Sequence, residues 1–191
     1  MRKFLNRHQA GQLLAHKLEH FLQHPNTLVL GLPRGGVPVA YEIAKALKLP
    51  FEVFLIRKLG VPYQEELAMG AIALGNICYL NEEIIKSLKI PAAEILKVKQ
   101  REEKELARRN KLYRQNKPFP NLEDKTIILV DDGIATGASI KVALAALRAQ
   151  RPAQLIVAAP VAPGTIYTSL SLEADKVVLL QTPEPFYGVG L

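Results

Sequence analysis

The feature that most constrains the fold is a run of apolar and β-branched residues, Thr126–Val130, that leads directly into two aspartates. A strand that is apolar at every position needs cover on both faces, as in a parallel sheet flanked by helices. Similar segments recur along the chain and alternate with helical patterns. We predict further strands at 27–30, 51–56, 155–159 and 176–180, and helices at 38–47, 138–149 and 165–172. The alternation predicts the α/β class, with a parallel sheet flanked by helices.

The remaining segments are predicted to form an N-terminal helix, two short strands, a loop and a long charged helical region. The helix covers residues 7–24, the strands 69–74 and 77–80, and the loop 57–62. The charged helical region covers 82–116, and Pro91 is expected to interrupt it. In the long region glutamates stand four positions from arginines and lysines, which is typical of a solvated helix face. An RNA-binding helix is the alternative interpretation of the same charges.

Length and composition predict one globular domain over residues 1–191. Hydrophobic residues make up 49% of the 191 and charged residues 23%, which excludes a largely disordered chain. No apolar run approaches the roughly 18 residues of a membrane-spanning helix, and no cleavable leader follows the basic start, so we expect a cytoplasmic protein without a membrane partner. The formal net charge of +7 favours an anionic partner, either nucleic acid or a phosphorylated small molecule.

Cysteine and histidine do not predict a metal centre. The single cysteine, Cys78, excludes an internal disulfide and a cysteine-based zinc site. Its apolar neighbours predict a small buried side chain, with a reactive thiol as the alternative. His16, His20 and His24 recur every four residues and are expected to line one exposed helix face, without the acid that a metalloprotease motif carries.

The two aspartates, Asp131 and Asp132, come where ligands bind in open α/β sheets, at the carboxyl end of a strand. Small and hydroxyl-bearing residues at 133–139, here called the small-residue loop, follow them into a helix. A helix N-terminus offers free backbone N–H groups to an anion, and glycine lets the backbone approach a phosphate closely. A sugar phosphate would satisfy both halves, through its hydroxyls and its phosphate. A tight turn with a helix cap is the alternative, but it accounts for only one of the acids.

From Val130 to Ser139 the sequence resembles the phosphoribosyl pyrophosphate motif of type I phosphoribosyltransferases, which has apolar residues, two acids and a loop ending in Thr-Gly. Residues 57–71 resemble a bacterial phosphoribosyltransferase-like subgroup of that family. So does an N-terminal pattern of Phe4, Arg7, Ala10 and Gly11, although Asn6 stands where the subgroup is expected to have aspartate. The resemblance implies a Rossmann-like core with a small hood built from the chain ends, at 1–24 and 181–191.

The resemblance also implies roles for individual residues. Asp131 and Asp132 would hold the ribose, and the small-residue loop would hold the 5′-phosphate. The loop residues are Gly133, Ile134, Ala135, Thr136, Gly137, Ala138 and Ser139. Arg34, Gly35 and Gly36 would bind the pyrophosphate group, after a candidate cis peptide bond at Pro33–Arg34 for which a plain turn is the alternative. Arg57 and Lys58, near the family's mobile catalytic loop, would join the aspartates as catalytic residues, with a surface ion pair as the alternative.

The implied reaction transfers the 5-phosphoribosyl group of phosphoribosyl pyrophosphate to a nitrogenous base or similar nucleophile and releases pyrophosphate. Mg²⁺ is the implied cofactor, held mainly by substrate oxygens, with Asp131 or Asp132 as its candidate protein ligands. Phe186 or Tyr187 would stack on the acceptor or pack in the core, and a homodimer is the assembly that the family suggests. Nucleic acid is disfavoured as a partner. The alternative function is a non-catalytic sensor of phosphoribosyl pyrophosphate or nucleotides, or an RNA-binding regulator, on the same fold.

Overall fold

The computed structural model describes residues 4–186 and 188–189, and these fall into two compact units. Unit 1 comprises Met1–Phe54, Leu122–Lys141 and Arg151–Leu191, and unit 2 comprises Leu55–Asn121 and Val142–Gln150. Helix α5 (Ala138–Arg148) begins in unit 1 and continues into the Val142–Gln150 segment of unit 2. The expectation that residues 1–191 form one phosphoribosyltransferase-like domain, with its hood at the chain ends, stays a prediction.

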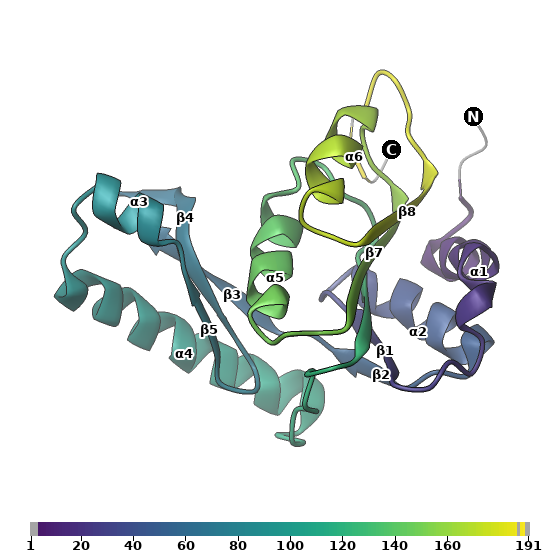
Figure 1. The fold of residues 1–191 in the computed structure, drawn as a ribbon, viewed down its shortest axis with the longest axis horizontal. Coiled ribbons are helices and arrows are strands. Elements are labelled where there is room, and N and C mark those ends of the chain that lie inside the picture. The colour runs from purple at the N-terminus through teal and green to yellow at the C-terminus, as the bar shows by residue number, and fades with distance from the viewer. Residues whose placement is uncertain (1–3, 187, 190–191) are drawn as a thin grey trace. The chain divides into compact units, whose positions relative to one another are not determined.

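Unit 1 is built on a five-stranded parallel sheet, which confirms the predicted fold class (Figure 1). Its strands lie in the order β2 (Phe51–Val53), β1 (Thr27–Gly31), β6 (Thr126–Val130), β7 (Gln154–Val161) and β8 (Lys176–Gln181). Every residue of β1 and β6 is buried, as their unbroken apolar sequence predicts for central strands. Gly31 pairs with Val130, and Val130 with Ala158, so β1, β6 and β7 bring their carboxyl ends to one edge.

Two helices, α1 (Arg7–Lys17) and α2 (Gly36–Leu47), cover one face of this sheet, and α6 (Gly164–Ser171) lies on the other (Figure 1). Leu14 of α1 and Ile43 of α2 are fully buried in one cluster with Val29 of β1 and Ile128 of β6. Each such side chain contributes roughly 1.5–3 kcal/mol of transfer free energy when it leaves water. The hydrophobic cluster therefore fixes α1 and α2 against the strands that lead to the aspartates.

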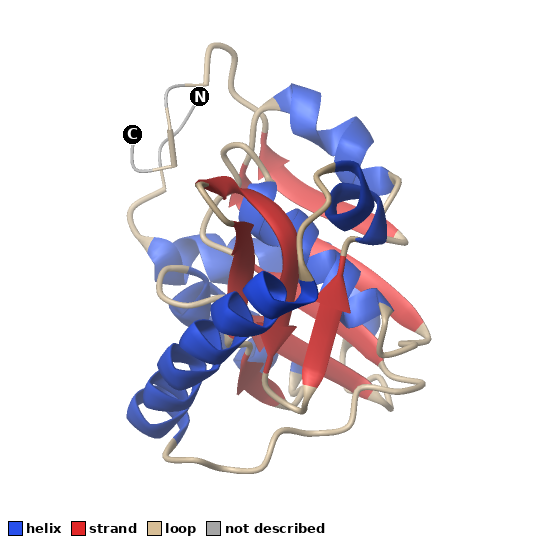
Figure 2. Ribbon diagram, turned by 90° about the vertical axis from the view of Figure 1, so that its left-hand side faces the viewer, coloured by secondary structure: helices blue, strands red, loops and turns tan. Residues whose placement is uncertain are grey.

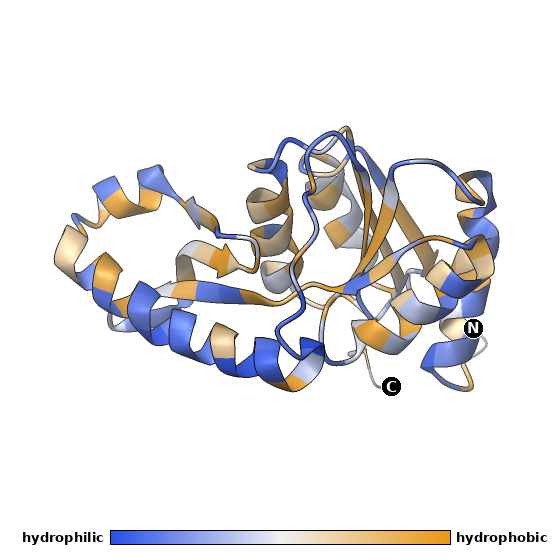
Figure 3. Ribbon diagram, turned by 90° about the horizontal axis from the view of Figure 1, so that it is seen from below, coloured by the Kyte–Doolittle hydropathy of each residue, from blue (hydrophilic) through white to orange (hydrophobic). Residues whose placement is uncertain are grey.

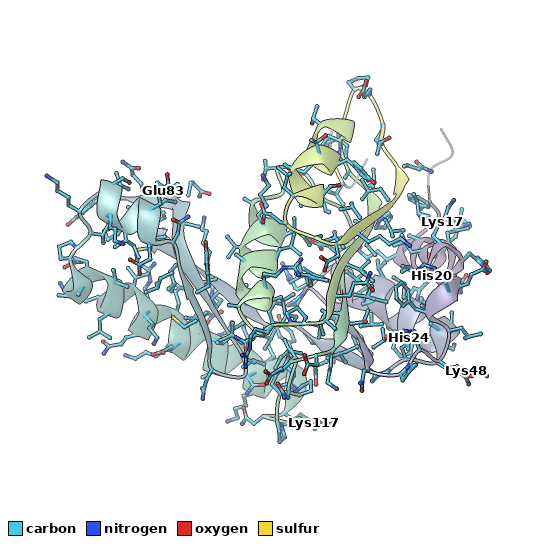
Figure 4. All side chains as sticks on the ribbon, in the orientation of Figure 1. Lys17, His20, His24, Lys48, Glu83 and Lys117 are labelled. Atoms are coloured by element: carbon cyan, nitrogen blue, oxygen red, sulfur yellow. The ribbon has the colours of Figure 1, made fainter. Side chains whose placement is uncertain are left out.

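The N-terminal helix is shorter than predicted. It ends at Lys17, and a single 3₁₀ turn (Glu19–Phe21) follows it, so His16, His20 and His24 are exposed but do not share one helix face. His20 and His24 lie on the outer side of unit 1 (Figure 4), where the His20 Nε2 atom is 3.1 Å from Nζ of Lys176. Partial burial is the larger cause, and the nearby Lys176 ammonium the smaller, of a lowered pKa at His20.

Unit 2 pairs an antiparallel sheet with two helices. The strands are β3 (Ile56–Val61), β4 (Gln64–Ala73) and β5 (Ile77–Leu80), and the helices are α3 (Glu82–Ser87) and α4 (Ala92–Arg114). The break at Pro91 is confirmed, because α4 begins directly after that residue. Helix α4 lies along the strands (Figure 2) and is hydrophilic over most of its length, whereas the unit 1 strands are hydrophobic (Figure 3).

Three local predictions are wrong in this unit or at its boundary with unit 1. Residues 57–62 are not a loop but most of β3 and the start of the hairpin turn at Pro62–Tyr63. The strand predicted at 51–56 is divided between β2 and the first residue of β3. Cys78 is exposed rather than buried, because its side chain faces away from the covered side of β5, where Ile77 is buried.

Within the described ranges, no helix combines the length and the apolar character that crossing a membrane requires.

Candidate functional site

The candidate site begins where β6 ends, with Asp131 and Asp132 at the carboxyl edge of the sheet. The Asp131 N–H donates to the carbonyl of Ala158 at 3.2 Å, so the chain is still tied to β7 at this point. On the other side, the Leu32 N–H donates to the carbonyl of Val130 at 2.9 Å. The segments after β1, β6 and β7 are thus joined through backbone groups, which places the two carboxylates by strand register.

Asp131, the first of the two aspartates, is partly buried. Its Oδ1 accepts a hydrogen bond of 2.9 Å from the backbone N–H of Asp132. Burial, together with the neighbouring Asp132 carboxylate, raises the pKa of Asp131 to about 7, although the hydrogen bond opposes this shift. A carboxyl group with a strongly raised pKa at the carboxyl edge of a sheet is a candidate functional residue.

Asp132 is held by an arginine from the N-terminal helix. The Nε and Nη2 atoms of Arg7 lie 2.8 Å and 2.6 Å from Oδ2 of Asp132. The Asp132 side chain retains 19% exposure and that of Arg7 58%, so the pair lies at the surface of the site. Arg7 was part of the N-terminal pattern in the sequence, but that pattern did not predict the contact.

The small-residue loop presents backbone rather than side chains. Ile134 is buried and its N–H donates to the carbonyl of Val161 at 2.9 Å, so its side chain faces the core. Within residues 4–186 and 188–189, the N–H groups of five loop residues have no hydrogen-bond acceptor: Gly133, Ala135, Thr136, Gly137 and Ser139. The Ala138 N–H faces the Thr136 hydroxyl at 3.4 Å. Free N–H groups at the start of a helix are the kind of donor that an anion uses, and the predicted binding of a phosphate here stays a prediction.

Gly137 is required where it stands in this loop. Its φ of +76° lies in the left-handed region, and a Cβ atom there would come within 2.6 Å of Cδ1 of Ile166. Its carbonyl accepts the 2.9 Å hydrogen bond from the N–H of Lys141 in the first turn of α5. The turn into the helix therefore depends on a residue without a side chain.

The loop after β1, at 33–36, packs directly against the aspartates. The Pro33–Arg34 peptide bond is cis, so the candidate named from the sequence is confirmed. A Cβ atom on Gly35 would overlap the Asp132 carboxylate, and one on Gly36 would lie 2.6 Å from the carbonyl oxygen of Val130. Arg34 is exposed and makes no hydrogen bond or ion pair with any described residue. This loop and the aspartates thus form one continuous surface in unit 1.

Arg57 and Lys58 lie in unit 2, on β3. The Arg57 guanidinium donates to Oε2 of Glu102 from Nε at 2.8 Å and from Nη2 at 2.6 Å, and the Glu102 side chain is 8% exposed. Lys58 Nζ lies 3.3 Å from the carbonyl and 3.4 Å from Oε2 of Glu66 on β4. Ion pairs are therefore present for both residues, and the one at Arg57 is largely buried.

Glu102 is buried, so the prediction that the glutamates of this helical region lie on a solvated face is wrong for this residue. It stands in an otherwise apolar helical row with Ile95, Val98 and Leu106, which is the face of α4 that becomes buried or partly buried. A carboxylate in such a row requires a cation from a neighbouring element. That pattern could have revealed Glu102 as a buried acid, but not which arginine pairs with it.

The chain end contributes little that the structure describes. Phe186 is partly buried, and Tyr187, the other predicted stacking residue, lies outside the described residues. A Cβ atom on Gly133 would overlap the Val189 side chain and come within 3.0 Å of Val161. Val189 therefore lies over the first residue of the small-residue loop.

The acidic residues of the site can serve a hard cation only in part. Among the described residues, no group of three or more histidine, cysteine, aspartate or glutamate side chains is placed to hold a metal ion. Asp131 and Asp132 are the carboxylates of this site, and so few protein ligands would suit only a Mg²⁺ ion bound chiefly through substrate oxygens and water.

Comparison with known proteins identifies relatives of the whole chain. Residues 78–182 match the model of the phosphoribosyl transferase domain. Two Mycobacterium tuberculosis proteins with the provisional name phosphoribosyl transferase, Rv0571c of strain H37Rv and MT0597 of strain CDC 1551, are 41% identical over 190 residues. The match covers 100% of this chain and 43% of each of theirs, so the chain spans less than half the length of these relatives.

Solved structures show the same fold. The TT1426 protein of Thermus thermophilus superposes with a TM-score of 0.88 at 36% identity, covering 99% of this chain and 89% of its own. The purine phosphoribosyltransferase of Pyrococcus horikoshii superposes with a TM-score of 0.53 at 15% identity, covering 93% and 84%. The second likeness concerns the fold alone.

Proposed function

This chain belongs to the type I phosphoribosyltransferase family, and from that premise we propose that it transfers the 5-phosphoribosyl group of phosphoribosyl pyrophosphate to a nitrogen nucleophile, with release of pyrophosphate. The observation that carries the proposal is the pairing, in unit 1, of two aspartates with a loop of unpaired backbone N–H groups. A pentose phosphate offers a diol to the aspartates and an anion to the loop. Such a ligand therefore uses both halves of the site at once.

The reaction forms a bond between the anomeric carbon and the acceptor nitrogen while the bond from that carbon to a pyrophosphate oxygen breaks. The electron pair of the broken bond leaves with the pyrophosphate, and positive charge develops on the ribose ring. The protein contributes position and electrostatics to this step. Asp131 and Asp132 would hold the ring by its hydroxyls, and the small-residue loop would hold the 5′-phosphate. The negative charge of the aspartates also favours the developing charge on the ring.

The leaving group would be bound by backbone and cations. Gly35 and Gly36 bring the backbone beside the aspartates, and Arg34 is exposed at the same loop with its guanidinium unpaired among the described residues. Mg²⁺ bound to the substrate would neutralise part of the pyrophosphate charge. On the family resemblance we also propose Arg57 and Lys58 as pyrophosphate contacts. Arg57 would then either give up its ion pair with Glu102 to bind the ligand, or keep that pair and donate to the ligand from its other terminal nitrogen, Nη1.

An RNA-binding role is less well supported by the charges of α4. Glu105 accepts from Nε of Arg108 at 2.7 Å and from Nε of Arg109 at 2.8 Å, and these two hydrogen bonds lower the pKa of Glu105 to about 2. Lys97 is likewise paired with Glu94 at 2.6 Å. Basic side chains that are neutralised by glutamates on the same helix offer less to a phosphate backbone than free ones do.

The proposal is tested in two stages with the full chain. Calorimetric titration with phosphoribosyl pyrophosphate, with and without Mg²⁺, measures binding, and we expect tighter binding with the metal. Release of pyrophosphate is then followed on adding purine, pyrimidine and other nitrogen bases one at a time. Binding followed by base-dependent release supports a transferase. Binding without release from any base supports a sensor on the same fold, and absence of binding contradicts both.

A further inference from the structure

We propose that Arg7 is a positioning residue of the sugar site, which orients the Asp132 carboxylate so that Oδ1 is presented to the ribose diol. The proposal rests on the proposed function and assigns the N-terminal helix a part in substrate binding. It starts from the contact already described, in which two nitrogens of Arg7 lie within 2.8 Å of Oδ2 of Asp132. Both contacts are made to Oδ2, so Arg7 leaves Oδ1 of Asp132 for another donor.

The Asp132 carboxylate is held on two sides. Arg7 takes one oxygen, and the backbone of Gly35 lies so close that a Cβ atom there would overlap the carboxylate. A guanidinium that donates twice to one oxygen restrains the carboxylate more strongly than a single donor does. Oδ1, the second carboxylate oxygen, is therefore restricted to one orientation. A fixed acceptor of this kind can receive a hydrogen bond from a ribose hydroxyl without first being ordered.

Helix α1 is itself fixed, so Arg7 starts from a defined position. Gly11 lets α1 approach α2 closely, since a Cβ atom there would lie 2.7 Å from both the Val39 carbonyl oxygen and Cβ of Glu42. Glu42 of α2 also accepts from Gln12 at 3.3 Å and lies 3.1 Å from Nδ1 of His8. Helix α2 begins at the 33–36 loop, so α1 is anchored to the element that leads out of the site.

The start of α1 is capped within the same pattern. Asn6 Oδ1 accepts from the N–H of Gln9 at 2.9 Å, which places Arg7 as the first residue of the helix. Asparagine therefore performs the capping that an aspartate would perform at this position. Each residue of the N-terminal pattern thus has a structural part. Asn6 caps the helix, Gly11 allows its close packing against α2, and Arg7 contacts Asp132.

The experiment measures the affinities of three probes for the full chain by calorimetry: ribose 5-phosphate, 2-deoxyribose 5-phosphate and inorganic phosphate. We expect Arg7→Gln to lower the affinity for ribose 5-phosphate about tenfold, which corresponds to the loss of one charge-assisted hydrogen bond, and to leave the affinity for inorganic phosphate unchanged. The ratio of the affinities for ribose 5-phosphate and 2-deoxyribose 5-phosphate should fall as well. Arg7→Lys should restore part of the affinity, because a lysine keeps the charge but not the two-nitrogen contact.

Two controls separate positioning from direct binding and from damage to the fold. Arg151→Gln removes an arginine of the same unit from its exposed pair with Glu123 and should leave all three affinities unchanged. The midpoints of urea denaturation of Arg151→Gln and Arg7→Gln should agree, which shows that both variants keep the fold. In an Asp132→Asn background, Arg7→Gln should have no further effect, because Arg7 acts through Asp132.

Three results would overturn the proposal. An Arg7→Gln variant with unchanged or tighter affinity for ribose 5-phosphate shows that the contact does not prepare the carboxylate. An equal loss of affinity for inorganic phosphate, or additive effects with Asp132→Asn, shows that Arg7 touches the ligand itself. A wild-type chain that binds neither ribose 5-phosphate nor phosphoribosyl pyrophosphate rejects the proposed function as well, whereas the first two results leave that function intact.

Discussion

The two units place their charged groups by different means. In unit 1 the aspartates stand at the end of an apolar strand, and backbone hydrogen bonds to the neighbouring strands set the position of their backbone, to which Arg7 adds an ion pair with Asp132. In unit 2 the cations Arg57 and Lys58 are held by side chains from other elements, above all Glu102 of α4. The difference shows that a site placed by strand register can be inferred from local sequence, whereas one placed by ion pairs depends on partners far along the chain.

The largest effect is expected at the unit 1 aspartates. Asp131→Asn with Asp132→Asn should lower turnover by about a thousandfold or more, because charge facing the developing positive ring is removed along with both diol acceptors. The rate of pyrophosphate release measures this effect, and far-ultraviolet circular dichroism checks that the fold is kept. Unchanged affinity for phosphoribosyl pyrophosphate in the double variant would contradict the role given to these carboxylates.

A smaller effect is expected at the turn of the small-residue loop. Gly137→Val should weaken ribose 5-phosphate binding by roughly 10- to 100-fold, because valine fits neither the positive φ nor the space beside Ile166. Gly164→Ala is the matched control, since the nearest atom to a Cβ there is the end of the Glu184 side chain at 3.2 Å. Binding of ribose 5-phosphate by Gly137→Val at wild-type affinity would show that the loop does not hold the phosphate.

The sequence was most informative where local pattern and fold agree. The parallel sheet, the helices after 36 and 138, and the strand-to-aspartate junction all follow from short apolar runs that alternate with helical patterns. The cis bond at Pro33–Arg34 and the unpaired N–H groups of the small-residue loop also lie where the family motif implied them.

The sequence was least informative where partners lie far apart. Nothing local indicates that Arg7 meets Asp132, 125 positions later, or that Arg57 meets Glu102. The 57–62 segment looked like a loop because it holds charged residues, Gly60 and Pro62, yet it pairs with β4 across an irregular register near Gly60. A strand whose charges are satisfied by a neighbouring strand and helix lacks the apolar run that identifies β6.

The ion pair in unit 2 is tested by Glu102→Gln. We expect the free energy of unfolding to fall by about 2–3 kcal/mol, because Arg57 and Arg101 lose the largely buried carboxylate that both contact. Glu103→Gln is the neighbouring control, where an exposed pair with Lys99 at 3.7 Å should be worth less than about 0.5 kcal/mol. Urea denaturation measures both changes. Equal effects of the two substitutions would show that Glu102 is not a structural partner of Arg57.

The smallest effect expected is a pH dependence that belongs to unit 1. The pKa of Asp131 is about 7 in the folded chain against an ordinary value of 3.8, so the folded chain retains a proton that the unfolded chain releases. The free energy of unfolding should therefore fall as the pH rises from about 4 to about 7. Between pH 5 and pH 7 the fall attributable to Asp131 is about 2 kcal/mol.

Urea denaturation of the wild type and of Asp131→Asn at several pH values isolates this contribution, because the other titrating groups are common to both. The variant should show a shallower dependence on pH, and its stability relative to the wild type should rise between pH 4 and pH 7 and level off above that range. If the two curves instead run parallel from pH 4 to pH 8, Asp131 titrates as an exposed carboxylate does, and the burial that sets it apart from the exposed ion pairs of α4 has no energetic consequence.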